Sequence, residues 1–412
     1  MSGSEPSTAK PGLLVISHVL PYPRSAGQNQ RVHYTLTALR ERFRVGFLTF
    51  QPPKAIEETR AKLAEWVDEP IVIPSLTAGN RRHQTIGRLY VAATGMKRSN
   101  YAIGQVEFTA DRIANNVDLN RYRIALFEYF HAWKAAAALK RRRPDLLTVL
   151  DMHDVLWRSY EQHLDQESRA PRLWRRFALK RYRAAEERSW RAFNGLIAIN
   201  RQEEAEARAH VGASSRVFYA PMGTDLNLWP YSHQPASPPR LAFYGGMAAP
   251  RNQEFARQCA ERIMPIVWSR RPETELWIVG NRPPQSIQAL AADPRIHVTG
   301  FVHEVQPLLG TMTAVLCPWS GTYGFRSRVV EAMALGLPII ANPDAVAGME
   351  LEHNAGVRLA DDPQGLADHA LALLNDPRLA IDEGRRARSK VESLYSLDAT
   401  YGRLTRELLE WG

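Results

Sequence analysis

The residues best suited to chemistry lie in one short segment, residues 324–331 (GFRSRVVE). Gly324 stands where a loop enters a predicted helix, and a glycine there lets an anion approach the backbone. The free N–H groups of a helix start attract negative charge, and Arg326 and Arg328 add formal charge suited to a diphosphate. About one turn later, Glu331 can accept hydrogen bonds from two neighbouring ribose hydroxyls. The spacing predicts a nucleotide site.

The competing interpretation of this segment is a surface helix with ordinary Arg–Glu pairs. The whole constellation favours the nucleotide site, because it follows an apolar run that ends at Pro318. The arginines supply charge compensation, and no pair of acidic residues suited to a metal ion stands nearby. We therefore expect neither a metal ion nor a further cofactor.

A second group of polar residues, Asp151-Met152-His153-Asp154, follows an apolar run. Ligands bind at the carboxyl ends of parallel strands, so His153 can hydrogen-bond a ligand hydroxyl and Asp154 can orient the imidazole. Glu128, which also follows an apolar run, is a further candidate. The alternatives are a structural histidine for His153 and a buried pair or helix cap for Glu128.

Two series of apolar runs position these residues. In the first series, Val32, Leu36, Leu39 and Phe43 recur at helical spacing after the first run. The predicted strands of this series are 13–19, 45–50, 71–73, 124–127, 147–150 and 196–199. Those of the second series are 241–244, 276–279, 296–298, 314–317 and 338–341, each ending at Gly, Pro or Asn. Strands that alternate with helices predict an α/β chain with two Rossmann-like, doubly wound domains.

The domain boundaries follow from composition. A stretch rich in proline and serine, 231–239, is the predicted linker. We expect an N-terminal domain over 1–230, a C-terminal domain over 231–385, and a C-terminal helix over 386–412 that returns to the N-terminal domain.

Composition narrows the class of protein. The 412 residues are 45% apolar and 23% charged, as in ordinary globular proteins. Two cysteines give no disulfide framework, and no secretory signal or run long enough to cross a bilayer is present. The expected location is the cytoplasm, and the protein can also bind peripherally to the inner face of the cell membrane. The net charge of +10 calls for an anionic partner.

The chain resembles the retaining glycosyltransferases of family 4, which have the GT-B fold. The resemblance covers nearly the whole chain, and the segment from Arg326 to Pro338 is its most specific part. The weaker motifs are Ser25-Ala26-Gly27, Ala220-Pro221-Met222-Gly223-Thr224-Asp225, Phe243-Tyr244-Gly245-Gly246-Met247 and Gly300-Phe301-Val302. The resemblance implies two domains that face each other across a cleft. It also implies a nucleotide-sugar donor on the C-terminal domain, an acceptor on the N-terminal domain, and transfer with retention and without a metal.

The resemblance also assigns roles to residues. Glu331 looks like the glutamate that closes the family's Glu-x7-Glu motif, whereas the opening position holds Tyr323. Gly246 stands where the family has an arginine, and Arg251 is the nearest basic residue. The residues expected to bind the donor are Gly27, Gly245, Gly246, Arg251, Gly280, Phe301, Val302, Tyr323, Gly324, Phe325 and Glu331. Those expected to act in catalysis are Arg326, Arg328, His153 and Asp154.

Neither Glu128 nor Asp154 is a compelling nucleophile. We therefore expect attack on the face that the leaving group departs from, with catalysis by positioning and by stabilisation of the diphosphate. This mechanism assigns the largest catalytic share to Arg326 and Arg328. A non-catalytic sugar-nucleotide-binding protein is the alternative from another class, because Tyr323 replaces a family carboxylate.

Basic residues gather in the predicted N-terminal domain. They are Arg169, Arg172, Arg175, Arg176, Lys180, Arg181, Arg183, Arg188 and Arg191, with Trp174, Phe177 and Trp190 between them. A second basic stretch covers 81–98. A basic helix with aromatics is typical of binding to an anionic membrane surface, which favours a lipid-linked or membrane-borne acceptor. A solvated helix with its aromatics in the core, serving a soluble acceptor, is the alternative, and we expect no nucleic acid partner.

Overall fold

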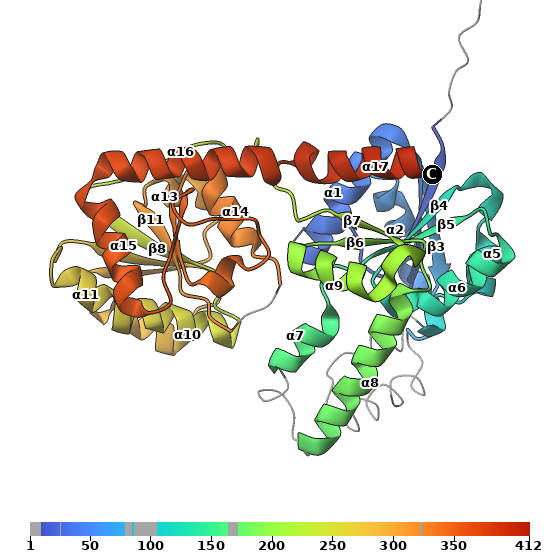
Figure 1. Ribbon diagram of the computed structural model, residues 1–412, viewed down its shortest axis with the longest axis horizontal. Helices are drawn as coiled ribbons and strands as arrows, with labels where there is room; N and C mark the ends of the chain where they lie inside the picture. The colour runs from blue at the N-terminus through green and yellow to red at the C-terminus, as the bar shows by residue number, and fades with distance from the viewer. Residues whose placement is uncertain (1–9, 25, 79–84, 86–104, 164–171, 322–323) are drawn as a thin grey trace, which may run out of the picture. The chain divides into compact units, whose positions relative to one another are not determined.

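The computed structural model describes residues 10–24, 26–78, 85, 105–163, 172–321 and 324–412. The chain divides into two compact units (Figure 1). The first comprises Met1–Pro221 and Tyr401–Gly412, and the second comprises Met222–Thr400. Each unit is built around one parallel sheet, which confirms the predicted α/β fold with two Rossmann-like sheets.

The sheet of the first unit has the strand order β3-β2-β1-β4-β5-β6-β7 in the described residues. Its strands are β1 Gly12–Ile16, β2 Arg44–Gln51, β3 Glu69–Pro74, β4 Ile124–Glu128, β5 Leu147–Asp151, β6 Gly195–Ala198 and β7 Arg216–Tyr219. All pairings are parallel. The central strands β1 and β4 are buried along their whole length, as expected for a parallel sheet covered on both faces.

The first unit also contains α-helices in its described residues. They are α1 Gly27–Arg42, α2 Ile56–Leu63, α5 Ala110–Asn116, α6 Trp133–Arg142, α7 Leu156–His163, α8 Arg172–Trp190, α9 Arg201–Val211 and α17 Arg403–Trp411. The C-terminal helix α17 lies beside α1 (Figure 1). Its residues Leu404 and Leu408 belong to the apolar core of the first unit.

The sheet of the second unit has the order β10-β9-β8-β11-β12-β13 in the part of the chain that is described. Its strands are β8 Arg240–Tyr244, β9 Glu275–Val279, β10 Ile296–Gly300, β11 Ala314–Cys317, β12 Ile339–Ala341 and β13 Val357–Leu359. Its helices are α10 Pro250–Gln258, α11 Met264–Trp268, α12 Gln285–Gln288, α13 Val305–Gly310, α14 Ser327–Ala334, α15 Pro363–Asn375 and α16 Pro377–Leu394. The edge strands β7 and β13 are absent from the sequence prediction.

The unit boundaries differ from the predicted ones in two places. Residues 222–230 belong to the second unit, because the Thr224 N–H donates to the Tyr395 carbonyl (2.7 Å) and Trp229 packs on the second core. Helix α16, which the predicted boundary at residue 385 divides in half, belongs entirely to the second unit. Its Ala387 and Val391 are fully buried there, so the return begins only at Tyr401.

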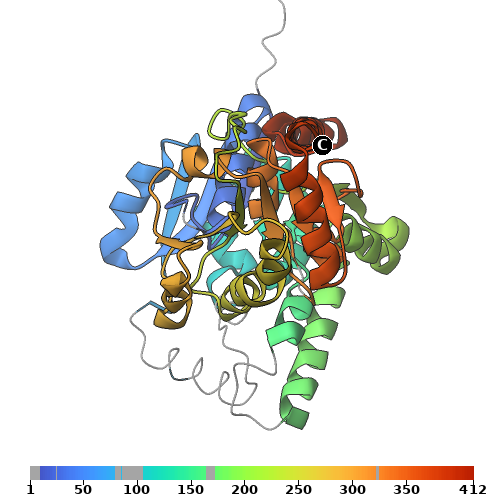
Figure 2. The ribbon, with the colours of Figure 1, turned by 90° about the vertical axis from the view of Figure 1, so that its left-hand side faces the viewer.

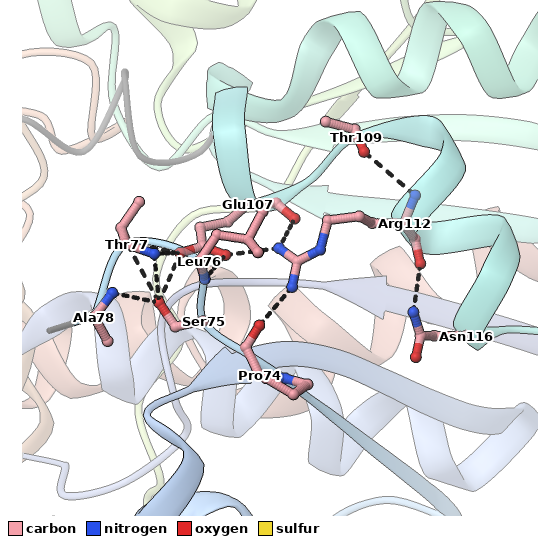
Figure 3. Close-up of polar contacts among 9 residues, drawn as sticks. All are labelled: Pro74, Ser75, Leu76, Thr77, Ala78, Glu107, Thr109, Arg112 and Asn116. Carbon is pink, nitrogen blue, oxygen red and sulfur yellow. Dashed lines mark hydrogen bonds and ion pairs between the residues drawn. The ribbon is translucent and has the colours of Figure 1, made fainter. Parts of the chain in front are cut away.

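A buried carboxylate fixes the loop that follows β3 (Figure 3). Glu107 accepts hydrogen bonds from the hydroxyls of Ser75 (2.7 Å) and Thr77 (2.6 Å) and from the N–H groups of Leu76 and Thr77. Arg112 donates to the same carboxylate at 2.7 Å. Burial raises the pKa of Glu107, but these hydrogen bonds outweigh burial and leave the pKa below its usual value. The carboxylate therefore holds the loop to the start of α5.

None of the helices in the described part of the chain is both long enough and apolar enough to cross a membrane.

Candidate functional site

The second sheet reverses its strand order between β8 and β11, so the loops after these strands meet at its carboxyl edge. The chain leaves β8 toward β9 and β10 on one side, and it leaves β11 toward β12 and β13 on the other. Such a reversal opens a ligand crevice in doubly wound sheets. Gly245 and Gly246 follow β8, and residues 324–331 follow β11. The fold thus gathers two of the predicted donor-binding segments at one edge.

The loops after β8 and β9 are in direct backbone contact. The Gly245 N–H donates to the Val279 carbonyl, and the Met247 N–H donates to the Asn281 carbonyl, both at 3.0 Å. A Cβ on Gly280 would lie 1.8 Å from the Gly245 carbonyl oxygen. Packing between the loops therefore requires glycine at position 280, whether or not a ligand is bound.

Glu331 is buried at this edge and is held by two side chains. It is 5% exposed. The Tyr244 hydroxyl donates to its Oε2 at 2.9 Å, and Arg328 Nη1 donates to the same oxygen at 2.5 Å. Arg328 also donates to the Tyr244 oxygen and lies 4.8 Å from the centre of that ring. Among the described residues, no side chain donates to Oε1 of Glu331, so this oxygen can accept from a ligand hydroxyl.

The electrostatics of this triad follow from its burial. Burial raises the pKa of Glu331, and the Arg328 guanidinium opposes that rise. Burial and the neighbouring Glu331 raise the pKa of Tyr244, so the phenol stays protonated and remains a donor. Arg328 is therefore engaged with Glu331 and Tyr244, although 46% of its side chain is exposed.

The start of α14 can receive an anion. Arg326 is its N-cap residue, and the Arg326 side chain makes no capping hydrogen bond to the first turn. Gly324 has φ +97°, a left-handed conformation that favours glycine. The Arg326 guanidinium lies 5.7 Å from the Trp319 ring, on the loop after β11. The N–H groups of a helix start, a glycine and an arginine thus converge at one helix end, as in phosphate sites.

The other predicted donor residues are more dispersed. Arg251, on α10, donates to the Ser320 carbonyl at 3.1 Å, so it lies against the loop after β11. Phe301 follows the edge strand β10 and is 75% exposed, and Val302 is half-buried. Phe325 packs edge-on against Tyr395, with ring centres 5.7 Å apart, and contacts the second core. One part of the Phe325 ring is thus packed on the core, and its contact with a donor stays a prediction.

Tyr323, on which the identity of the donor sugar depends, lies outside the described residues, and so do Ser25, Arg169 and the basic stretch 81–98 except residue 85. Gly27 is the first residue of α1 and is exposed.

The first sheet reverses its strand order between β1 and β4, and its strand ends carry a different set of residues. Arg31, on α1, is 1% exposed, and Asp151, at the end of β5, is fully buried. Arg31 Nε donates to both carboxylate oxygens at 2.9 and 2.8 Å, and Nη1 donates to the Ala220 carbonyl at 3.0 Å. Although burial disfavours its charge, the carboxylate of Asp151 holds the pKa of Arg31 above its usual value. Arg31 and Asp151 thus form a buried ion pair in which each neutralises the charge of the other.

His153 and Glu128 lie beside this pair. His153 Nε2 is hydrogen-bonded to Glu128 Oε2, and both side chains are buried. The His153 ring stacks on Tyr129, with centres 4.1 Å apart and planes 11° apart. Tyr129 has φ +68° and His153 has φ +60°, and such strained conformations cluster at functional sites. Glu128 is therefore the carboxylate on His153 Nε2, in the orienting role that the sequence analysis gives to Asp154.

Two further histidines extend this cluster. His18 follows β1, and its ring lies 5.4 Å from Tyr129 and 5.5 Å from His131. Burial, together with the charge of His153, lowers the pKa of His18 to about 4. Burial also raises the pKa of Glu128. Aromatic faces and neutral hydrogen-bonding groups suit a ligand rich in hydroxyls better than an anion.

The same cluster contains three residues that could hold a metal ion. One ligand atom from each of Glu128, Asp151 and His153 lies within 4.8 Å of the others. However, Arg31 already neutralises Asp151, and His153 already bonds Glu128. A divalent ion would stand beside a buried guanidinium, so the residues present fit a metal poorly.

Arg31, His18, Tyr129 and His131 are not among the residues that the sequence indicates, and Tyr244 is indicated only as part of a motif, without a role. One signal was available for Arg31, which shares a helix face with the small residues Thr35 and Ala38. An arginine on the buried stripe of a helix requires a buried acid. The others carry no local pattern, because only the topology brings them together.

Residues 238–376 match the family Glycosyl transferases group 1. No curated protein sequence matches the chain.

Solved structures share the fold. Sucrose-phosphate synthase from Thermosynechococcus elongatus is similar, with a TM-score of 0.66, 19% identity, and coverage of 98% of this chain and 100% of that one. Anabaena HepE in complex with UDP has a TM-score of 0.65 at 14% identity, covering 97% and 100%. A glycosyltransferase from Rickettsia africae has a TM-score of 0.61 at 12% identity, covering 97% and 99%. These likenesses confirm the predicted GT-B fold.

Proposed function

We propose that this chain is a glycosyltransferase that moves a sugar from a nucleotide-diphosphate donor with retention and without a metal ion. The family match over residues 238–376 and the GT-B fold support this proposal. The observation that carries the proposal is the buried Glu331, held by Tyr244 and Arg328, one turn from the start of α14. A carboxylate suits two ribose hydroxyls, and a helix start suits a diphosphate.

Each group has one task in this proposal. Glu331 Oε1 accepts from the ribose, because Oε2 is already occupied by Tyr244 and Arg328. The N–H groups of α14 and the Arg326 guanidinium receive the diphosphate, with Gly324 leaving room for its oxygens. Arg328, half-exposed, adds charge beside them. Phe301 is exposed beyond β10 and is available to the base.

In the proposed reaction, the acceptor hydroxyl attacks the anomeric carbon on the face from which the diphosphate departs. The new C–O bond forms as the bond to phosphate breaks, and the acceptor's proton passes to the departing phosphate oxygen. The positive groups at α14 stabilise the charge that develops on the diphosphate. His153, held by Glu128, hydrogen-bonds a hydroxyl of the sugar or the acceptor.

Among nucleotide sugars, UDP-sugars are the donors to test first, because the HepE structures contain UDP and UDP-glucose. We propose an acceptor borne on a membrane, in the assembly of a bacterial envelope or exopolysaccharide, with the protein working at the cytoplasmic face. The net charge of +10 supports an anionic setting of this kind.

Two other functions remain to be tested against this one. The same chemistry on a soluble acceptor, such as a natural product, needs no membrane. A non-catalytic sugar-nucleotide-binding protein is the other, and it draws support from Tyr323 standing where the family has a glutamate.

The decisive experiment is a thermal-shift screen against UDP, GDP, ADP and their sugars, followed by an assay of donor hydrolysis. A ligand that binds only the folded state raises the apparent stability, so one nucleotide should raise Tm selectively and its sugar should be hydrolysed. Glu331→Ala should lose the shift, whereas the matched exposed acid variant Glu254→Ala should keep it. Binding without hydrolysis supports the non-catalytic alternative, and no shift with any nucleotide overturns the donor site.

A further inference from the structure

The exposed surface of α8 combines apolar and basic side chains. Leu173, Trp174 and Phe177 are 80%, 62% and 56% exposed. At 100° per residue they occupy one arc of the helix. Leu179, Tyr182 and Trp190 lie on the opposite side and are buried. The helix extends away from the sheet of its unit in both views (Figures 1 and 2). The aromatics that the sequence shows interleaved with basic residues are thus divided, with Trp190 in the core and Trp174 and Phe177 outside.

The charges on this surface have one sign. Between residues 172 and 185 the helix has six basic residues and no acidic one. Arg176, Lys180 and Arg181 are exposed beside the apolar residues, and Arg181 lies 5.9 Å from the Phe177 ring. The first acids, Glu186 and Glu187, are both used within the fold. Glu186 accepts from the N–H groups of Leu156 and Trp157 at the start of α7, and Glu187 pairs with Arg183.

We propose that this patch, Leu173, Trp174 and Phe177 with Arg176, Lys180 and Arg181, is a docking surface for an anionic lipid bilayer. Large apolar side chains ringed by cations complement a membrane interface, where rings enter the headgroup region and cations meet lipid phosphates. A protein partner would have to supply both an apolar groove and a rim of acids. The docking surface would bring the enzyme to a membrane-borne acceptor. Only this purpose rests on the proposed function; the binding to lipid does not.

Vesicle flotation of the full chain tests the docking surface. The vesicles contain phosphatidylcholine alone or with 30% phosphatidylglycerol, and no nucleotide sugar is added. The chain should float with the anionic vesicles and not with the neutral ones, and high salt should release it. No binding to anionic vesicles, or equal binding to neutral ones, overturns the proposal.

Two matched pairs of variants locate the surface. Trp174→Ser with Phe177→Ser should weaken anionic vesicle binding at least tenfold. The control pair Leu76→Ser with Leu228→Ser, whose side chains are 48% and 45% exposed, should not change it. Arg176→Gln, Lys180→Gln and Arg181→Gln together should weaken binding about a hundredfold. Arg270→Gln, Arg385→Gln and Arg386→Gln remove the same charge from the second unit and should have much less effect. Equal losses in the test and control variants would refute the assignment to α8.

The two proposals fail separately. Flotation needs no donor, so a chain that hydrolyses UDP-sugars but ignores vesicles retains the glycosyltransferase function and loses the docking surface. Self-association is measured by sedimentation. If wild-type protein dimerises, the α8 variants abolish the dimer, and vesicles are not bound, the patch is an interface between copies and the membrane proposal is wrong.

Discussion

The two sheets reverse their strand order in the same way, yet the residues at the two reversals differ in kind. At the β1/β4 reversal, the charged groups neutralise one another inside the protein: Arg31 with Asp151, and His153 with Glu128. At the β8/β11 reversal, the N-cap residue Arg326 does not cap the start of α14 with its side chain, and half-exposed Arg328 stands beside this helix start.

This difference shows that topology selects the place of a ligand site while side chains select the ligand. The first reversal offers aromatic faces and hydrogen-bonding groups of little net charge, which suit sugar hydroxyls. The second offers a helix start with two arginines beside it, of which Arg328 is paired with Glu331, and this setting suits a diphosphate. Removing charge should therefore reduce stability at the first reversal and reduce ligand binding or turnover at the second.

The largest expected effect is on stability at the first reversal. Asp151→Ala leaves the Arg31 guanidinium buried without its acid, and losing one partner of a buried pair costs about 3–5 kcal/mol. Urea unfolding, followed by fluorescence, measures this loss. The double variant Arg31→Met with Asp151→Leu should recover much of the free energy of unfolding. A loss below about 1 kcal/mol in Asp151→Ala would mean that Arg31 and Asp151 do not form the buried ion pair described.

The next effect is on turnover at the second reversal. Arg326→Ala should lower kcat by about 10²–10³-fold, because it removes a donor aimed at the developing charge of the leaving group. The KM for the acceptor should change little. Arg257→Ala is the control, since Arg257 is exposed on α10 and pairs with Glu254. A normal rate in Arg326→Ala would remove its leaving-group role and weaken the contrast between the two reversals.

A smaller loss of turnover is expected at the first reversal. His153→Ala should lower kcat by up to about 10²-fold through misplacement of the reacting hydroxyl, with nucleotide affinity unchanged. Glu128→Gln, which keeps a hydrogen-bonding group near Nε2, should have a milder effect in the same direction. Steady-state kinetics and calorimetry with the nucleotide separate the two quantities. Weaker nucleotide binding in His153→Ala would place part of the anion site at the first reversal.

The two sites also differ in how far the sequence predicts them. The second is contiguous over 324–331, so residue types and spacing suffice to indicate it. The first joins Arg31 to Asp151 across 120 residues, and only the strand order brings them together. Asp154 is next to His153 in sequence, but the neighbour strand supplies Glu128 at Nε2.

The elements of the fold differ in the same way: those with a contiguous sequence pattern are predictable, and those that depend on packing are not. Central strands are apolar on both faces and were predicted from their runs. The edge strand β13 is three residues long with an arginine at its centre, so no apolar run indicates it. The edge strand β7 contains the short apolar run 217–219, which the sequence prediction leaves out. Likewise, Trp190 and Trp174 share one basic helix, and only packing separates the buried ring from the exposed one.

The next prediction concerns the nucleotide affinity of the second reversal. Glu331→Ala should weaken nucleotide affinity at least tenfold, about 1.4 kcal/mol, because it removes a charged acceptor for ribose. Tyr244→Phe keeps the carboxylate and loses one of its donors, so it should weaken affinity less. Isothermal calorimetry measures both. Unchanged affinity in Glu331→Ala would remove the ribose assignment and leave the reversal as a phosphate site alone.

The smallest expected effect is that of a chelator, which should leave activity and stability unchanged. If positive groups of the second unit compensate the leaving diphosphate, EDTA should change neither kcat nor Tm. The three potential ligands of the first reversal, Glu128, Asp151 and His153, make this a real test. Arg31 donates to Asp151 at 2.8–2.9 Å, so a divalent ion there would have to share a carboxylate with a buried guanidinium. Activity that disappears with EDTA and returns with Mg²⁺ or Mn²⁺ would show that the charge compensation at the second reversal is incomplete.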